Sequence, residues 1–515
     1  MSSDLRSLTF IYCSKLAAFV INSLSVIIVV PYVSSVPVDY AIYMFALSLT
    51  FILTYGDLGF MSAAQKYCAI SVGAKKYDAE IKDVGYVLTL LISIGAAFSI
   101  IMILGTIYPL SFIPSLDADS KELASNIFLI IGLMMPVQVI LQRLTSLILS
   151  SRLKEYVYVI FDICANLAKI IMVPYFDLPS GFALELYLLT SILLSIFSAI
   201  LCLILIPFCT NFDLFRLIRH IKFSRSSFKK MRSLAFSSIL STAFFILTFE
   251  CDLIIASRLF SLENVASYAL ALTLINFIRS ASSIIYGPVI AFVNRDLGAG
   301  NREKVIRNFQ EIIEFSTSLF ITIVVVIYLS AEPLVIQWLG NGNPLVVEIF
   351  QVMLIGSIFV SLSNLVPLVA TTYEHRIKLI ISSAIPFLSF YIFLVYAINF
   401  YSELSIVTLA YAKAVALISA AVFALAYFTK ISVFTVNQLK VMIYCSGTGY
   451  CLYRLVDFLI YPAYLDFLST DMTLINFLAL LTVLLILIWI FLVLLVKTTR
   501  SKFIFLCRRF IMLNL

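Results

Sequence analysis

The sequence predicts an all-α polytopic membrane protein with about 14 transmembrane helices: two parallel six-helix lobes followed by two further helices. Three observations lead to this fold class. Of the 515 residues, 62% are hydrophobic and only 12% are charged, and the mean hydropathy is +1.08; soluble domains average about 45–50% apolar and about 25% charged residues. Apolar stretches of membrane-spanning length recur along the chain. A pattern in the first half also returns in the second.

The apolar stretches give the predicted spans. A helix needs roughly 20 apolar residues to cross the hydrocarbon layer. The first stretch is longer than the apolar region of a signal peptide and carries Lys15, so we expect a retained helix rather than a cleaved leader. The fourteen predicted spans are 8–32, 39–61, 84–109, 122–149, 155–176, 181–209, 233–257, 263–292, 308–330, 344–371, 377–399, 404–428, 440–461 and 472–496.

The loops between these spans predict the orientation. With the spans in place, 28 of the 35 lysines and arginines fall on one side, and Lys121 and Arg258 fall on the other. Cationic loops resist translocation, so the cation-rich side is expected to be cytoplasmic. An even number of spans then places both termini in the cytoplasm. The expected location is the inner (plasma) membrane of a bacterium.

An internal repeat predicts the two lobes. Residues 35–50 align with 260–275, and residues 73–81 align with 298–306, both at a shift of 225 residues. The shift equals six predicted spans, an even number, so both halves insert the same way up and form a parallel repeat. The predicted parts are an N-terminal six-helix lobe (1–210), a basic cytoplasmic amphipathic linker (211–232), a C-terminal six-helix lobe (233–430), and two extra helices with a basic tail (431–515).

The linker is the longest basic loop. Its first half can form an amphipathic helix, and two roles are open. It can lie on the anionic lipid of the inner leaflet, or it can dock a partner protein. The residues expected on its apolar side are Phe212, Leu214, Phe215, Leu217 and Ile221.

Charges inside the predicted spans are the candidate functional residues, because a Lys or Arg at a helix centre costs about 2.5–3.5 kcal/mol on insertion scales. Arg279 and Lys413 have no acid within four residues, so we expect them to face a wet central cavity that attracts anions such as phosphate. Arg454 and Asp457, three residues apart, can pair locally. The full candidate set for a cationic cavity is Arg279, Lys413, Lys15 and Lys169.

Acids and a proline complete the candidate residues. Asp162, Glu250 and Asp252 are candidates for ion coupling. Asp162 and Lys169 are seven residues apart and can alternatively bond across helices, while Lys15 can instead extend to the cytoplasmic interface. Pro288 follows Arg279 on the same predicted helix and is the candidate hinge, although a static kink is equally compatible with a proline there.

Several kinds of chemistry are not expected. The chain has two histidines and no metal-binding constellation, and its nine cysteines behave as small apolar residues. There is no nucleotide-binding loop and no nucleophile motif. We therefore expect no enzyme activity, no cofactor and no nucleic-acid partner.

Two stretches resemble a known family. Residues 250–274, ECDLIIASRLFSLENVASYALALTL, resemble the start of the second half in polysaccharide (O-antigen, Wzx-type) flippases. Residues 55–76, YGDLGFMSAAQKYCAISVGAKK, resemble the exit from the second helix in the same family. The wider MATE-like exporter group also contains lipid II flippases and multidrug exporters.

The resemblance implies a V-shaped pair of six-helix bundles that moves undecaprenyl-pyrophosphate-linked oligosaccharide across the inner membrane by alternating access. The partners it implies are this lipid-linked glycan, membrane lipids, and glycan polymerase or chain-length regulator proteins. Many members of the Wzx type are described with twelve spans, so fourteen is a departure. Two alternatives stay open: a MATE-like cation-coupled exporter of organic cations, and a membrane scaffold for glycan assembly.

Overall fold

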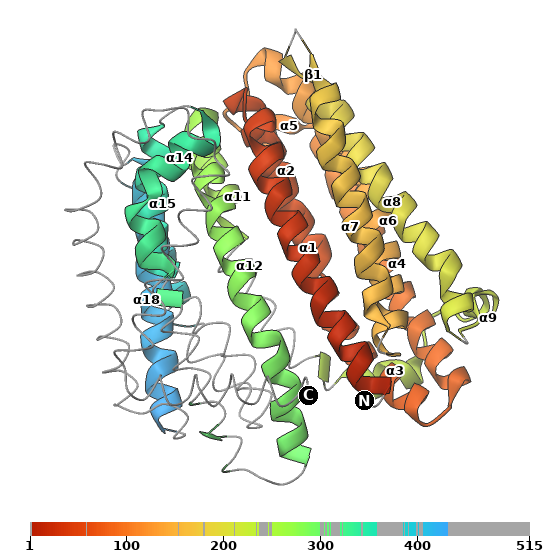
Figure 1. Ribbon diagram of the computed structural model, residues 1–515. Coiled ribbons are helices and arrows are strands. Elements are labelled where there is room, and N and C mark those ends of the chain that lie inside the picture. The colour runs from red at the N-terminus through yellow and green to blue at the C-terminus, as the bar shows by residue number, and fades with distance from the viewer. Residues whose placement is uncertain are drawn as a thin grey trace. The chain divides into compact units, whose positions relative to one another are not determined.

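The computed structural model describes residues 3–57, 59–152, 154–178, 181–210, 212–232, 250–298, 323–340, 343–357, 391–397 and 405–430, together with single residues and short runs between these ranges. The described chain is almost entirely helical (Figure 1). Its elements are α1 (Ser3–Val33), α2 (Pro37–Tyr55), α3 (Phe60–Gly73), α4 (Tyr77–Ile107), α5 (Pro109–Phe112), α6 (Ala118–Ser150), α7 (Glu155–Met172), η1 (Val173–Phe176), β1 (Asp177–Leu178), β2 (Gly181–Phe182), α8 (Leu184–Cys209), α9 (Leu214–Arg219), α11 (Asp252–Leu259), α12 (Leu262–Gly298), α14 (Ala331–Leu339), α15 (Pro344–Ser357) and α18 (Ile406–Lys430).

Six helices in the described part of the chain are long and apolar enough to cross a membrane. Each coincides with a predicted span, so the all-helical membrane fold is confirmed for these segments. The predicted spans 440–461 and 472–496, with Arg454 and Asp457, lie outside the described residues. The six segments are Cys13–Val33, Tyr77–Ile107, Ser120–Ser150, Glu155–Phe176, Leu184–Cys209 and Ile406–Tyr427.

Contacts divide the chain into two compact units, Met1–Ala269 and Leu270–Leu515. In the first unit, successive long helices run in opposite directions. The N-terminus, α3 and α9 lie at one end of this unit, and α5 and the short β1–β2 hairpin lie at the other (Figure 1). The basic loop residues near positions 75, 153 and 220 therefore gather at one end, as the predicted loop alternation requires.

The predicted span 39–61 is interrupted in the structure. Helix α2 ends at Tyr55, and α3 begins at Phe60. Gly59 has a positive φ of 74°, a conformation that glycine adopts without steric cost. The Asp57 carboxylate accepts bonds from the backbone N–H groups of Gly59 (3.3 Å) and Met61 (3.1 Å). The first N–H groups of a helix have no acceptor within the helix, and Asp57 supplies one at the start of α3.

The internal repeat is visible in the helix boundaries. At the start of the repeat, α2 begins at Pro37 and α12 begins at Leu262. At its end, α3 stops at Gly73 and α12 stops at Gly298. Both pairs of boundaries differ by the 225 residues of the sequence repeat. The first copy of the repeat divides this stretch into two helices, whereas the second copy forms one continuous helix.

Two other predicted boundaries are wrong. A single span was expected over 233–257, but residues 250–251 form a turn and α11 starts at Asp252. Residues 331–339, expected in a loop, form α14.

Small residues allow close helix packing in the first unit. A Cβ atom on Gly132 of α6 would lie 2.7 Å from the Cβ of Met102 on α4. The Ser99 hydroxyl of α4 donates to the Gly132 carbonyl oxygen at 2.7 Å across the same contact. In a lipid environment the hydrophobic effect does not drive helices together. Helices there commonly associate through close backbone contact at glycine and through hydrogen bonds between helices, and this contact has both.

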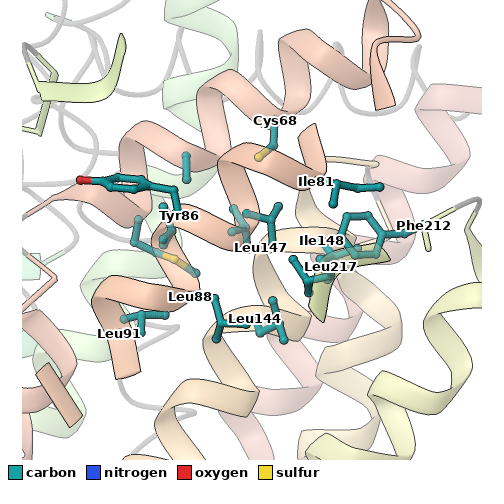
Figure 2. Close-up of a cluster of buried hydrophobic side chains, with 14 of the residues drawn as sticks. Cys68, Ile81, Tyr86, Leu88, Leu91, Leu144, Leu147, Ile148, Phe212 and Leu217 are labelled. Carbon is teal, nitrogen blue, oxygen red and sulfur yellow. The ribbon is translucent and has the colours of Figure 1, made fainter. Parts of the chain in front are cut away.

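The linker packs onto the first unit. Phe212, Leu217 and Met231 are almost fully buried in a hydrophobic cluster with side chains of α3, α4 and α6 (Figure 2). The prediction of a single apolar side is therefore wrong in part, because Phe215 is 85% exposed and Ile221 is also exposed. Short-range packing against α4 and α6 divides the apolar residues of the linker between two opposite sides.

Polar contacts hold the linker in the same position. The Arg152 guanidinium bonds both carboxylate oxygens of the fully buried Glu80 and lies 5.3 Å from the centre of the Phe212 ring. The Asp83 carboxylate of α4 accepts a bond from the Ser227 hydroxyl at 2.7 Å and pairs with the Lys230 ammonium.

Gly85 is the tightest point of this contact, because a Cβ there would lie 2.3 Å from the His220 carbonyl oxygen. We therefore expect Gly85→Ala to displace the linker and to lower the free energy of unfolding by about 1–3 kcal/mol, as overpacking does. Thermal unfolding of the purified protein in detergent measures this. Gly73→Ala is the matched control, because a Cβ at Gly73 meets nothing within 4 Å; equal effects of both substitutions would contradict the assigned contact.

Candidate functional site

A row of polar side chains lies on α7 and faces α1. The Asn166 Nδ2 donates to the Asn22 Oδ1 of α1 at 2.9 Å and lies 3.4 Å from the Asp162 Oδ2. The Lys169 Nζ donates to the Asn166 Oδ1 at 3.1 Å. One amide therefore links an acid, a cation and a neighbouring helix.

The spacing explains this arrangement. Asp162, Asn166 and Lys169 are separated by four and three residues, so they share one face of α7. Helix α7 is about 27 Å long at 1.5 Å per residue, and Asp162 lies near its middle. The three side chains are half-buried, and Asn22 is exposed. A polar face at this depth of an apolar helix is a functional candidate by default.

From the sequence alone, Asp162 and Lys169 could meet on α7 or bond across helices, and neither Asn22 nor Asn166 was a candidate residue. The structure shows that they are connected through Asn166 rather than by direct contact. The signal was present in the sequence, because Asn166 lies between the two charges at helical spacing. An amide can serve both, since its oxygen accepts from the ammonium and its nitrogen donates to the carboxylate.

A second polar group lies at the break between α2 and α3. Arg143 of α6 is close enough to Asp57 and to Tyr158 to interact with both electrostatically. Tyr158 interacts in the same way with Asp162. Ionisable and polar groups thus connect the helix break to the row on α7. Arg143 was among the 28 cations counted on the cytoplasmic side, although it falls inside the predicted span 122–149; the structure places it within α6, which continues to Ser150.

Lys15 is part of an ion pair. Its Nζ lies 3.2 Å from the Glu155 Oε1 at the start of α7, and both side chains retain exposed surface. The pair joins α1 to α7 near the end of the unit that carries the basic loops. Lys15 and the Asn22–Asn166 contact therefore lie along the same helix pair, at different depths.

The acids near α11 are buried. Glu250 is 5% exposed and Asp252 is fully buried, and both make contacts within the protein. Asp252 is an electrostatic neighbour of the buried Tyr268 phenol, whose oxygen lies away from solvent.

Arg279 and Lys413 belong to the second unit. Arg279 is half-buried in α12, and the Nη1 atom of its guanidinium is buried. Lys413 is 3% exposed in α18. Both side chains interact with other groups of the protein. Next to Lys413, Ala414 meets Gly356 of α15, where a Cβ would lie 2.8 Å from the Ala414 Cα, so these two helices are closely packed.

Pro288 lies within α12, whose backbone remains helical from Leu262 to Gly298. The helix therefore passes through Pro288 without ending there. Its role as a hinge stays a prediction.

Comparisons with known proteins agree with this architecture. Residues 13–174 match the MatE family model. No curated protein sequence matches the chain. The structure is similar to the inward closed conformation of the lipid II flippase MurJ, with a TM-score of 0.64 and 14% identity, over 95% of this chain and 98% of the flippase.

Two MATE transporters are similar as well. An inward-facing multidrug resistance MATE family transporter of the MOP superfamily gives a TM-score of 0.63 at 13% identity, over 82% of this chain and 98% of its own. The eukaryotic MATE transporter AtDTX14 gives a TM-score of 0.62 at 17% identity, over 87% of this chain and 99% of its own. The protein is a membrane protein whose fold is shared with these flippase and MATE transporter structures.

The bridge through Asn166 predicts an energetic coupling between Asp162 and Lys169. In a double-mutant cycle with Asp162→Asn and Lys169→Met, the combined loss of unfolding free energy should be smaller than the sum of the single losses by about 0.5–1 kcal/mol. Unfolding in mixed micelles measures it. The coupling should vanish in an Asn166→Leu background.

A control pair should be additive. Lys169→Met combined with Thr190→Ala is suitable, because the Thr190 hydroxyl bonds only to carbonyl oxygens of its own helix α8 in the described chain. If the coupling survives in the Asn166→Leu background, Asn166 does not connect the two charges.

Proposed function

We propose that this protein is a flippase that moves undecaprenyl-pyrophosphate-linked oligosaccharide, such as an O-antigen or another surface polysaccharide repeat unit, across a bacterial inner membrane by alternating access. Both termini would face the cytoplasm. The proposal rests on the transporter fold and on the charges within its helices.

The observation that carries the proposal is the presence of Arg279 and Lys413 deep within helices of the second unit. Such cations are costly in a membrane, and proteins retain them where they serve a cargo or a conformational change. A pyrophosphate head group is an anion that an arginine fork and a lysine point charge both suit. Since both side chains already interact within the protein, the head group would have to replace these interactions when the helices move.

The extent of the structural similarity supports a flippase over a drug exporter. The MATE structures described above are matched by 82–87% of this chain, and the lipid II flippase by 95%. The difference between these shares, 95% against 82–87%, is 8–13% of the chain. A larger cargo with a polyprenyl tail is one reason for a transporter to carry additional residues.

The first unit supplies candidates for energy coupling. Asp162 is bonded to a neutral amide and lies near Lys169, so a proton or a monovalent cation at its carboxylate would change the bonds that join α7 to α1. Glu250 and Asp252 are further candidates. Pro288 would provide the bend in α12 that exchanges the two access states.

A MATE-like exporter of organic cations is the second candidate function. The observation that favours it is the half-buried Asp162 inside the segment 13–174 that matches the MatE model. An acidic pocket in the first unit would attract a cationic drug.

Transport by the reconstituted protein separates the two functions. We expect proteoliposomes to translocate a fluorescent polyprenyl-pyrophosphate glycan and to show no uptake of ethidium. Arg279→Ala should reduce glycan translocation by about 10–100-fold, because a charge-assisted contact contributes about 1.5–3 kcal/mol. Arg279→Lys should retain part of the activity, because it keeps the charge and loses the fork.

Lys121→Ala is the matched control, since Lys121 is an exposed cation at the other end of the first unit from the basic loops. It should transport as the unaltered protein does. Full glycan translocation by a folded Arg279→Ala protein would remove Arg279 from the cargo site. Ethidium uptake that depends on Asp162, without glycan translocation, would replace the flippase by the exporter.

A further inference from the structure

We propose that the outward side of the linker binds anionic lipid headgroups at the membrane surface beside α8. This outward side is formed by Phe215, Ile218 and Phe223 together with Arg219, Lys222 and Arg225, and we call it the outer linker surface. The proposal does not depend on which cargo the protein moves.

The apolar half of the outer linker surface is unusually exposed. Phe215 is 85% exposed and Ile218 is 66% exposed. Phe223 is 64% exposed, and its ring centre lies 5.7 Å from that of Tyr86 of α4. The linker places its other apolar side chains in the core, where Phe212 and Leu217 are almost fully buried (Figure 2). Large apolar side chains in a segment that also has a buried side indicate a second apolar environment outside the bundle.

The charged half is available for a partner. Arg219, Lys222 and Arg225 are exposed, and none of the three takes part in an ion pair within the described part of the chain. Two of the other four linker cations are paired, because Arg216 pairs with Asp78 and Asp213, and Lys230 pairs with Asp83. Lys229 and Arg232 are exposed and, in the described part of the chain, take part in no ion pair. Acids of the protein thus neutralise Arg216 and Lys230, whereas the three cations beside the exposed apolar side chains have no such partner in the described chain.

The position of the linker makes the membrane the adjacent surface. Helix α8 is one of the candidate membrane spans and ends at Cys209, only a few residues before Phe215. Phe208, in the last turn of α8, is 83% exposed. The outer linker surface therefore starts at the point where the chain leaves the hydrocarbon, within reach of the lipid headgroups.

The orientation of the outer linker surface is fixed by its inward contacts. The His220 backbone packs against Gly85, and Ser227 and Lys230 bond to Asp83. Rotation of the linker would break these contacts and expose Phe212 and Leu217. The apolar and cationic residues consequently stay on the outer side, in the interleaved pattern typical of segments that lie in the membrane interface.

Charge complementarity selects anionic lipid as the occupant. Residues 212–232 carry seven lysines and arginines and one acid, Asp213. Lysine and arginine near a membrane are attracted to the negative surface potential of anionic lipid, and the exposed aromatic and aliphatic side chains can enter the headgroup region. Zwitterionic lipid offers the apolar contact without the charge.

Hydrogen–deuterium exchange of the full-length protein in nanodiscs tests the proposal. Peptides covering residues 212–226 are compared in phosphatidylcholine alone and in phosphatidylcholine in which about a third of the lipid is phosphatidylglycerol. We expect exchange in these peptides to be several-fold slower in the anionic nanodiscs. The difference should decrease at high ionic strength, because exposed charges are then screened. Peptides from α4 serve as the internal standard for a folded bundle.

The variant Arg219→Gln/Lys222→Gln/Arg225→Gln should lose the lipid-dependent difference, with the α4 peptides unchanged. The control Lys66→Gln/Lys75→Gln/Lys76→Gln removes three exposed cations from the same unit and should keep it. Equal exchange in the two lipid mixtures, or a difference that survives in the linker variant, would overturn the proposal. Protection found only in native membrane vesicles would indicate a protein partner and would overturn it as well.

Discussion

A polar group inside the hydrocarbon layer must find its partner in the protein, and the described bundle depends on this requirement. The Asn166 side chain provides a hydrogen-bond partner for both Asp162 and Lys169, and it also bonds to Asn22 of α1. The Asp57 carboxylate accepts hydrogen bonds from two backbone N–H groups that would lack a partner at the break between α2 and α3. Because each solution is local to one or two helices, the first unit carries several ionisable side chains and still packs as a regular helical bundle.

The same constraint explains how duplicated halves acquire different chemistry. The stretch from α2 to α3 and its repeat, α12, begin and end at equivalent positions, but they differ in between. The left-handed Gly59 and the capping Asp57 correspond in sequence to Ile284 and Ser282, which neither favour a left-handed residue nor offer a carboxylate. Helix α12 therefore continues where its counterpart breaks. Arg279 corresponds in sequence to Thr54, so the permanent cation belongs to one half only.

The sequence predicted the fold well, because hydropathy over twenty residues is a large and additive signal. Spans such as 155–176 and 181–209 follow directly from it, and the resemblance to a transporter family is matched by the fold. Local features were harder to predict. The break at Gly59 depends on a backbone conformation, and the bridge through Asn166 depends on which face α7 turns to α1. Hydropathy averages over both.

The candidate residues show the same limit. Charge inside a span could be identified from the sequence, which is how Asp162, Lys169 and Arg279 were selected. Whether a charge has a partner depends on contacts between helices, and Lys15 illustrates this, because Glu155 lies 140 residues away and still pairs with it. Arg143 lies inside the predicted span 122–149 but was counted with the loop cations, and the charge alone did not indicate its neighbours Asp57 and Tyr158. Pairing partners and boundaries are therefore the information that coordinates add.

The linker shows how one segment can satisfy two environments. Its sequence alternates apolar and basic residues, and a helical projection alone assigns the apolar ones to one side. Packing against α4 and α6 takes Phe212 and Leu217 inward, and this leaves Phe215, Ile218 and Phe223 outward beside unpaired cations. The buried side fixes the position of the segment, and the position decides which residues meet the membrane surface. A segment that reads as a connector between lobes is, up to Met231, structurally a part of the first unit.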